Sequence, residues 1–224
     1  MTGYDTLDVT RDGPVGWLVF DRPDVGNAID ARMFEDLEAA WSELEQDPGV
    51  RAIVTTGNGN AFQTGLDVAQ LAGDKDALRR SSRQTRDAEL RMTAWHCGVT
   101  KPVIAAVNGV CAGGGLHFVA DADIVIAADD AAFLDPHVSV GQVSAFETIG
   151  LAKKAPMEAI SRMALLGRHE RVTAERARQL GIVSEVVPAD RLRTRAQTLG
   201  ETIAQHDPDH LAAIKTALWG ALER

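Results

Sequence analysis

The 224-residue sequence is long enough for one domain with a substantial core, and its 45% hydrophobic and 25% charged residues exclude a disordered chain. A net charge of -9 excludes the basic surface typical of general nucleic-acid-binding proteins. Because no apolar run is long enough to span a membrane and the start lacks the pattern of a signal peptide, we expect a cytoplasmic protein that binds neither nucleic acid nor membrane.

The first quarter of the chain predicts strands around one helix. Apolar residues recur at helical spacing over residues 30–46, with Asp30 as the N-cap. Asp12 begins a turn with glycine and proline, and residues 57–60 form a glycine-rich loop. Three segments have the pattern of strands: 4–10, 15–20 and 50–55.

The remainder alternates between apolar strand segments and helical segments, which is typical of the α/β class. Further strands are predicted at 103–107, 124–127 and 182–187. Helices are predicted at 76–95, 113–120, 156–166, 173–180, 188–204 and 208–222. We interpret residues 1–187 as one core unit and residues 188–224 as a helical C-terminal region.

Two glycine-containing segments follow predicted strands. In residues 61–67, Gly65 permits a sharp chain reversal that could leave the N–H of Leu66 pointing outward; an ordinary loop with Asp67 as a helix cap is the alternative. In residues 108–115, consecutive glycines at a helix start could bring free N–H groups close to a ligand. Tight packing of helix against strand is the alternative there.

Two histidines lie near these segments. His117 belongs to the short helix after the glycines, and His137 follows a proline in an apolar loop. Histidine exchanges protons near neutral pH, although a single histidine on an apolar face is more often a hydrogen-bonded core residue. Asp135 and Glu147 are reserve candidates, and for each we favour a solvated or capping role.

The two cysteines, Cys97 and Cys111, are too few for a disulfide framework and lie in no metal-ligand spacing. We expect both to be reduced, buried thiols. His96 precedes Cys97, but no Asp or Asn lies at a readable spacing, so a structural role is favoured over a nucleophilic pair.

Together these segments resemble the crotonase, or enoyl-CoA hydratase/isomerase, superfamily. The resemblance runs from about residue 4 to about residue 220. Its most specific part is the Lys-Pro-Val-Ile-Ala-Ala-Val-Asn-Gly run over residues 101–109 together with the glycines at 113–115. Further matching segments are 61–67, 120–123, 132–133, 173–177 and 181–183.

The resemblance implies a spiral of β-β-α repeats with a helical C-terminal region that builds trimers or dimers of trimers. It implies an acyl-CoA substrate, and an oxyanion hole made of the backbone N–H groups of Leu66 and Gly114. It implies no cofactor besides the coenzyme A of the substrate, and no metal. The residues that it places at the substrate and its coenzyme A are Asn27, Ala28, Ile29, Gly65, Asp67 and Gly113.

The sequence departs from the pattern of this family at its catalytic positions. Well-known hydratases carry two glutamates where this chain has His117 and His137, and their Pro-Gly-Ala-Gly-Gly stretch is replaced by residues 142–147. A histidine pair can supply one acid and one base, so we predict an atypical hydratase, dehydratase or isomerase. A C–C bond or thioester hydrolase and a catalytically silent CoA-ester binding protein remain alternatives. The family pattern also implies further helix beyond residue 222.

Overall fold

The structure is a computed structural model that describes residues 3–67 and 91–222. Among these residues the strands are β1 (Leu7–Asp12), β2 (Val15–Phe20), β3 (Ala52–Gly57), β4 (Ala61–Gln63), β5 (Val103–Val107), β6 (Val110–Ala112), β7 (Ile124–Ala128), β8 (Ala132–Leu134), β9 (Val172–Thr173) and β10 (Glu185–Val187). The α-helices are α1 (Ala31–Gln46), α4 (Gly115–Ala120), α5 (Phe146–Ala152), α6 (Met157–Leu166), α7 (Ala174–Leu180), α8 (Leu192–Ile203) and α9 (Pro208–Leu222).

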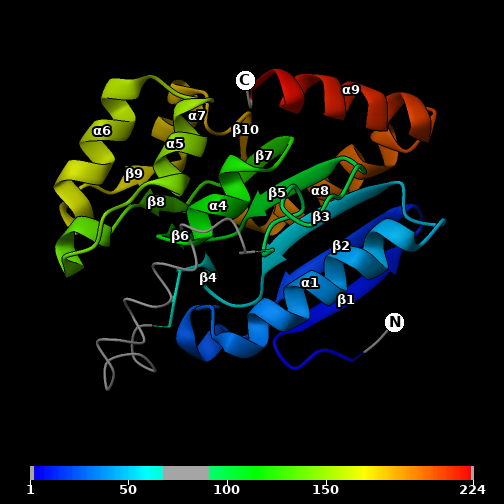
Figure 1. The fold of residues 1–224 in the computed structure, drawn as a ribbon, viewed down its shortest axis with the longest axis horizontal. Helices are drawn as coiled ribbons and strands as arrows, with labels where there is room; N and C mark the ends of the chain where they lie inside the picture. The colour runs from blue at the N-terminus through cyan, green and yellow to red at the C-terminus, as the bar shows by residue number, and fades with distance from the viewer. Residues whose placement is uncertain (1–2, 68–90, 223–224) are drawn as a thin grey trace.

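The strands form two sheets, and the chain passes back and forth between them as it proceeds (Figure 1). The larger sheet has the order β1-β2-β3-β5-β7-β10, and the smaller sheet has the order β4-β6-β8-β9. Of the strand pairs in the described residues, the outer pairs β1–β2 and β8–β9 are antiparallel and the others are parallel. Each of the pairs β3–β4, β5–β6 and β7–β8 gives its first strand to the larger sheet and its second to the smaller. This repeated turn is the spiral that the family resemblance predicted.

Helices α1 and α8 cover opposite faces of the larger sheet. Adjacent residues of a strand point to opposite faces. A Cβ at Gly16 would lie 2.7 Å from Leu44 of α1, whereas a Cβ at Gly200 of α8 would lie 2.7 Å from Val15. The central strands β2, β3 and β5 are therefore buried on both sides and consist mainly of apolar residues.

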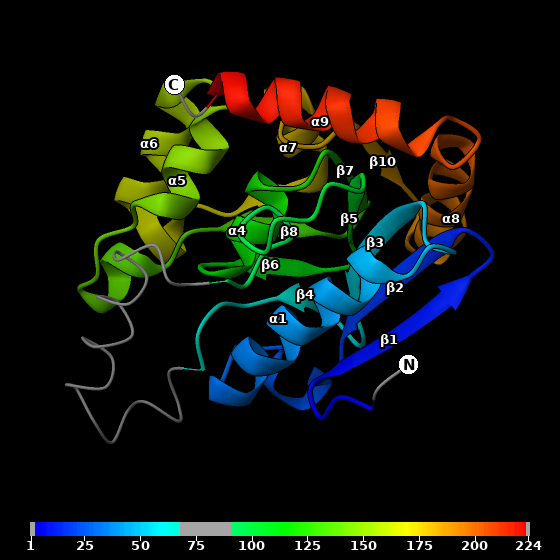
Figure 2. The ribbon, with the colours of Figure 1, turned by 45° about the vertical axis from the view of Figure 1, so that its right-hand side comes forward.

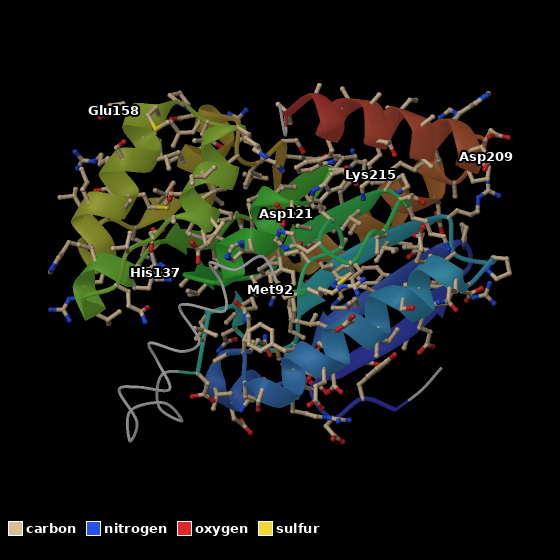
Figure 3. The ribbon with its side chains drawn as sticks, in the orientation of Figure 1. Met92, Asp121, His137, Glu158, Asp209 and Lys215 are labelled. Atoms are coloured by element: carbon tan, nitrogen blue, oxygen red, sulfur yellow. The ribbon has the colours of Figure 1, made fainter. Side chains whose placement is uncertain are left out.

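Helix α9 folds back across the edge of the core rather than extending away from it (Figure 2). Lys215 is buried, and its Nζ lies 3.0 Å from Asp123 and donates to the carbonyl oxygen of Lys101 at 2.8 Å. The indole of Trp219 donates to Asp123 at 2.7 Å and stacks on Trp95. Figure 3 shows Lys215 near the middle of α9 on the side that faces the core, and Asp209 at the beginning of the helix, where it is exposed. The helix is thus held by charge and stacking as well as by apolar contact.

Most of the predicted elements are present. The cap predicted for the first helix is confirmed, because the Asp30 side chain accepts a hydrogen bond from the N–H of Met33 at 2.8 Å. The predicted strand over 182–187 is shorter, since only Glu185–Val187 is paired. The helix predicted over 76–95 lies mostly outside the described residues, and its last part, 91–95, is irregular with a turn. None of the helices in the described ranges is long and apolar enough to cross a membrane.

The short strands of the smaller sheet were missed. They contain two or three residues each, which is too short for a repeating apolar pattern to be recognised. The boundary predicted between residues 187 and 188 stays a prediction. Helix α8, just beyond it, packs on the larger sheet, where Gln197 accepts a hydrogen bond from the indole of Trp17 at 2.9 Å.

Candidate active site

The loop after β4 presents a main-chain donor. Ile29 and Leu66 form an isolated parallel bridge, in which the N–H of Ile29 donates to Gly65 at 2.8 Å and the N–H of Asp67 donates to Ile29 at 2.9 Å. In such a bridge the residue between the two bonded neighbours directs its own N–H to the other side. The N–H of Leu66 accordingly has no hydrogen-bond partner among residues 3–67 and 91–222.

A second main-chain donor begins α4. The N–H of Gly113 donates to Leu134 at 3.2 Å, and the N–H groups of Leu116 and His117 donate back to Gly113 and Gly114. The N–H of Gly114 is left without a partner in the described part of the chain, as expected at the start of a helix.

The two loops touch at these donors. Gly65 has a φ of +89°, and a Cβ there would lie 2.9 Å from the nitrogen of Gly114. The structure therefore brings the two N–H groups predicted for the oxyanion hole into adjacent loops, and within the part of the chain that it describes neither has an acceptor. Gly113 faces His137, since a Cβ at this glycine would lie 3.6 Å from Cε1 of the imidazole.

Gln63 holds the first loop in shape and was not singled out from the sequence. Its Oε1 accepts the N–H of Gly65 at 2.7 Å, and its Nε2 donates to the carbonyl oxygen of Asn27 at 3.1 Å. The side chain is fully buried. Because the N–H of Gly65 donates to Gln63, the next N–H along the chain, that of Leu66, is the one that remains available to a ligand.

The segment expected at coenzyme A is braced internally. Asn27 has a φ of +59°, and its buried amide donates to the carbonyl oxygens of Asn58, Ala61 and Phe62. This side chain shapes the loop and has no donor to spare for a ligand. The next residues, Ala28 and Ile29, are buried. Contact of the segment with coenzyme A stays a prediction.

Asp67 is drawn into an ion cluster rather than left in solvent. One Nη of Arg22 lies 3.2 Å from Asp67 and 3.2 Å from Asp30, and the other donates to the carbonyl oxygen of Ala28 at 2.5 Å. Arg22 thereby connects the loop of the first donor to the start of α1. Its charge is offset by two carboxylates.

His117 and His137 approach each other through a shared carboxylate. Nε2 of His117, on α4, lies 3.1 Å from Oε1 of Glu147, and Nε2 of His137 lies 3.6 Å from the same oxygen. On its other side, Nδ1 of His137 lies 2.5 Å from Oδ1 of Asp135, which also accepts the backbone N–H of His137 at 3.1 Å. Figure 3 shows His137 on the lobe that carries α5 and α6.

The solvated role favoured for Asp135 and Glu147 is wrong, although Asp135 does accept the backbone N–H of His137. Asp135 is fully buried and Glu147 is only 6% exposed. Buried carboxylates need partners of opposite charge or hydrogen-bond donors, and here the imidazoles supply them. Glu147 lies in the first turn of α5, close to the two histidines in space. The sequence alone does not show this proximity, because it depends on how the chain runs between residues 137 and 147.

These contacts shift two pKa values. Burial alone would raise the pKa of Glu147, but the hydrogen bond and charge of His117, together with His137, lower it to about 2. Burial alone would lower the pKa of His137, but the hydrogen bond to Asp135 and the charges of Glu147 and Asp135 raise it. Near neutral pH Glu147 is thus a carboxylate, and His137 holds a proton more readily than a free histidine.

The cysteines take no part in this arrangement. Cys111 is fully buried in β6, and burial raises the pKa of its thiol. Cys97 is half-buried and its thiol donates to the carbonyl oxygen of Arg91; burial raises its pKa to about 12. Both thiols are free and in the protonated, non-nucleophilic form. Within the described ranges, no three His, Cys, Asp or Glu side chains are grouped to hold a metal ion.

Known proteins resemble this chain over nearly its whole length. The sequence model of the enoyl-CoA hydratase/isomerase family matches residues 10–224. A probable enoyl-CoA hydratase of Mycobacterium bovis is 33% identical over 98% of this chain and 83% of its own length. A carnitinyl-CoA dehydratase of Salmonella arizonae is 34% identical over 94% of this chain and 79% of its own length.

Solved structures agree. A crystal structure of an enoyl-CoA hydratase/isomerase from Mycobacterium paratuberculosis superposes with a TM-score of 0.86 and 36% identity, covering 99% of this chain and 84% of that one. An enoyl-CoA hydratase subunit from Geobacillus kaustophilus gives a TM-score of 0.87 at 30% identity, covering 100% of this chain and 84% of that one. The chain therefore belongs to the enoyl-CoA hydratase/isomerase family and has its crotonase-like fold.

Proposed function

We propose that the protein is an enzyme that adds water to, removes water from, or shifts a double bond of an acyl-CoA thioester. The observation that carries this proposal is the pair of N–H groups, of Leu66 and Gly114, which lie in adjoining loops and have no hydrogen-bond partner among residues 3–67 and 91–222. Relatives named enoyl-CoA hydratase and carnitinyl-CoA dehydratase support the same substrate class.

The chemistry follows from where charge develops. In hydration, the oxygen of water bonds to the β-carbon while one imidazole accepts the proton of the water. The electron pair of the double bond moves toward the thioester, and the resulting enolate oxygen is held by the N–H groups of Leu66 and Gly114. The second histidine, as an imidazolium, then gives its proton to the α-carbon. Donors that bind the enolate more strongly than the ground state lower the barrier.

The two histidines are assigned unequal roles. The raised pKa of His137 favours it as the imidazolium that gives up a proton, which leaves His117 as the base. Dehydration runs the same steps in reverse. A shift of the double bond needs the same acid and base without water.

A hydrolase on the same fold is the second candidate, favoured by one observation. The contact between Asp135 and Nδ1 of His137 is the carboxylate–imidazole arrangement that orients a histidine base. Such a base could direct water at a carbonyl carbon, releasing free CoA or an acid from a cleaved C–C bond. A silent CoA-ester binding protein would bind without either outcome.

One panel of substrates separates these functions. The purified protein is incubated with crotonyl-CoA, a 3-oxoacyl-CoA and a cyclic 1,3-diketone CoA ester. We expect hydration or isomerisation by the unaltered protein, reduced about 100-fold or more in His117→Gln and His137→Gln, because general acid–base catalysis contributes at least that much. His169→Gln, a change of an exposed histidine, is the matched control.

The other outcomes decide against the first proposal. Release of CoA or of a ring-opened acid would identify a hydrolase. Binding without turnover of any substrate would identify a binding protein. Turnover that is unchanged in both variants would remove the two histidines from the mechanism.

We also propose that the protein assembles into trimers or dimers of trimers. Large apolar side chains lie exposed in residues 138–149 and on α6, and exposed apolar side chains that gather in one part of a protein often mark an interface. They are Val138, Val140, Val143, Phe146, Ile149, Met157, Leu165 and Leu166.

We expect light scattering after gel filtration to give three or six times the 24.0 kDa mass of one chain. Val143→Asp combined with Ile149→Asp should shift the mass toward that of the monomer, because charges would be buried without partners. Arg162→Gln, a change of an exposed residue on α6, is the control. A monomeric unaltered protein would contradict the assembly.

A further inference from the structure

Glu147 lies between the two histidines and contacts both of them. One oxygen of its carboxylate faces the Nε2 atoms of both rings, at 3.1 Å from His117 and 3.6 Å from His137. The three side chains come from different parts of the chain: α4, the loop after β8, and α5. With two imidazoles and no anion between them, like charges would oppose one another whenever both were protonated.

Asp135 fixes the second ring from its far side. Its Oδ1 binds both Nδ1 and the backbone N–H of His137, so the ring can direct only Nε2 toward Glu147. Oδ2 of Asp135 is buried and has no hydrogen-bond partner among the described residues. His137 is therefore the group that balances this buried carboxylate, and it is held between two anions.

We propose that Glu147 is a positioning residue of the histidine pair, which holds the two Nε2 atoms at one point and stabilises His137 as an imidazolium without touching the substrate. The inference rests on the proposed function, in which this pair moves the protons. It assigns to one carboxylate a role that the glutamates of well-known hydratases do not have, since here the carboxylate acts through the histidines.

Other charged and titratable groups lie near the histidine pair. The ring of His96 lies 6.4 Å from that of His117, and Nδ1 of His96 lies 3.9 Å from a carboxylate oxygen of Asp121. Lys154 caps the end of α4 through the carbonyl oxygens of Val119 and Ala122. Glu147 and Asp135, in contrast, lie directly against the ring of His137, at 3.6 and 2.5 Å from its two nitrogens.

The test combines a spectroscopic readout with kinetics on three variants. Glu147→Gln removes the charge and keeps the size, and Glu147→Asp keeps the charge and shortens the reach. Glu158→Gln is the matched control; Glu158 lies exposed on α6, where Figure 3 shows it at the far end of the lobe from His137. Histidine titrations are followed by NMR in the free protein labelled at histidine, and kcat and KM are measured on the acyl-CoA turned over fastest.

We expect Glu147→Gln to lower the NMR midpoint of His137 by about one pH unit or more, because an opposite charge at this distance shifts a titration by that amount. We expect kcat to fall about 10- to 100-fold, with KM changed less than about threefold, since only proton transfer is impaired. In Glu147→Asp the midpoint should stay within about half a unit of the original while kcat falls. Glu158→Gln should change none of these values.

An unchanged His137 midpoint in Glu147→Gln would overturn the positioning role, whatever happens to kcat. If the midpoint falls as expected while the unaltered protein turns over no substrate, the positioning of the rings is supported and the proposed function is wrong. If Glu147→Gln does not fold, as judged by circular dichroism, Asp135→Asn and Glu147→Asp decide. Asp135→Asn should lower the midpoint of His137 and Glu147→Asp should not; the opposite pattern would contradict the proposal.

Discussion

Gly65→Ala is expected to lower kcat on an acyl-CoA substrate by about 100-fold or more. The added methyl group would lie 2.9 Å from the nitrogen of Gly114, where it obstructs one of the two N–H groups proposed to hold the enolate oxygen. The positive φ of 89° would also favour a shift of the loop that carries Leu66. Loss of a single oxyanion donor costs about 100- to 1000-fold in kcat in acyl-transfer enzymes, which sets the scale of this expectation.

Gly13→Ala is the matched control for the backbone cost. Gly13 also has a positive φ, but a Cβ there meets nothing within 4 Å, and it lies in the turn between β1 and β2. The left-handed conformation alone should lower the free energy of unfolding of each variant by about 1–2 kcal/mol. Gly65→Ala should lose more, because its Cβ also meets backbone atoms of Gly114 and Ala112. Only Gly65→Ala should lose activity in a steady-state assay. Equal activity in the two variants would mean that the two loops do not form the oxyanion site.

Gly115→Ala is expected to lower the free energy of unfolding by about 3 kcal/mol, the upper end of the usual cost of overpacking. Its Cβ would overlap the carbonyl oxygen of Gln63, and the Oε1 of the same residue would be 2.8 Å away. Gln63 cannot retreat freely, because its side chain is buried and hydrogen-bonded to both Asn27 and Gly65. The measurement is urea unfolding followed by circular dichroism.

Gly220→Ala is the control for that experiment. Gly220 lies in α9 and has open space where a Cβ would be, so alanine should leave stability unchanged or raise it by up to about 1 kcal/mol through its higher helix propensity. If Gly115→Ala were as stable as the control, the close packing of α4 against the loop of Gln63 would not be a constraint on the fold.

The backbone part of the site could be predicted from the sequence. Glycines at 65 and 113–115 mark places where the chain comes close to another chain segment, and the run over 101–109 fixes which family pattern applies. The positions of Leu66 and Gly114 follow from that pattern. The structure adds that both N–H groups lack partners among residues 3–67 and 91–222.

The side-chain part could not be predicted in full. His117 and His137 were recognised as residue types suited to proton transfer, but their partners depend on tertiary contacts. Glu147 is 30 residues from His117 along the chain and reaches it only because α5 packs beside α4. Gln63 was read as part of a loop, although its amide determines which N–H of that loop is presented.

The spiral construction has a consequence for how this protein can change. Leu66 follows β4, Gly114 follows β6 and His137 follows β8, so successive coils of the chain each contribute one component. The distance between successive turns of the spiral therefore determines how Leu66, Gly114 and His137 are placed relative to one another. A substitution of a buried side chain on β3 or β5, remote from the reacting atoms, should alter turnover by changing this distance. Exchange of the side chains at positions 117 and 137, in contrast, can alter the reaction and leave the spiral unchanged.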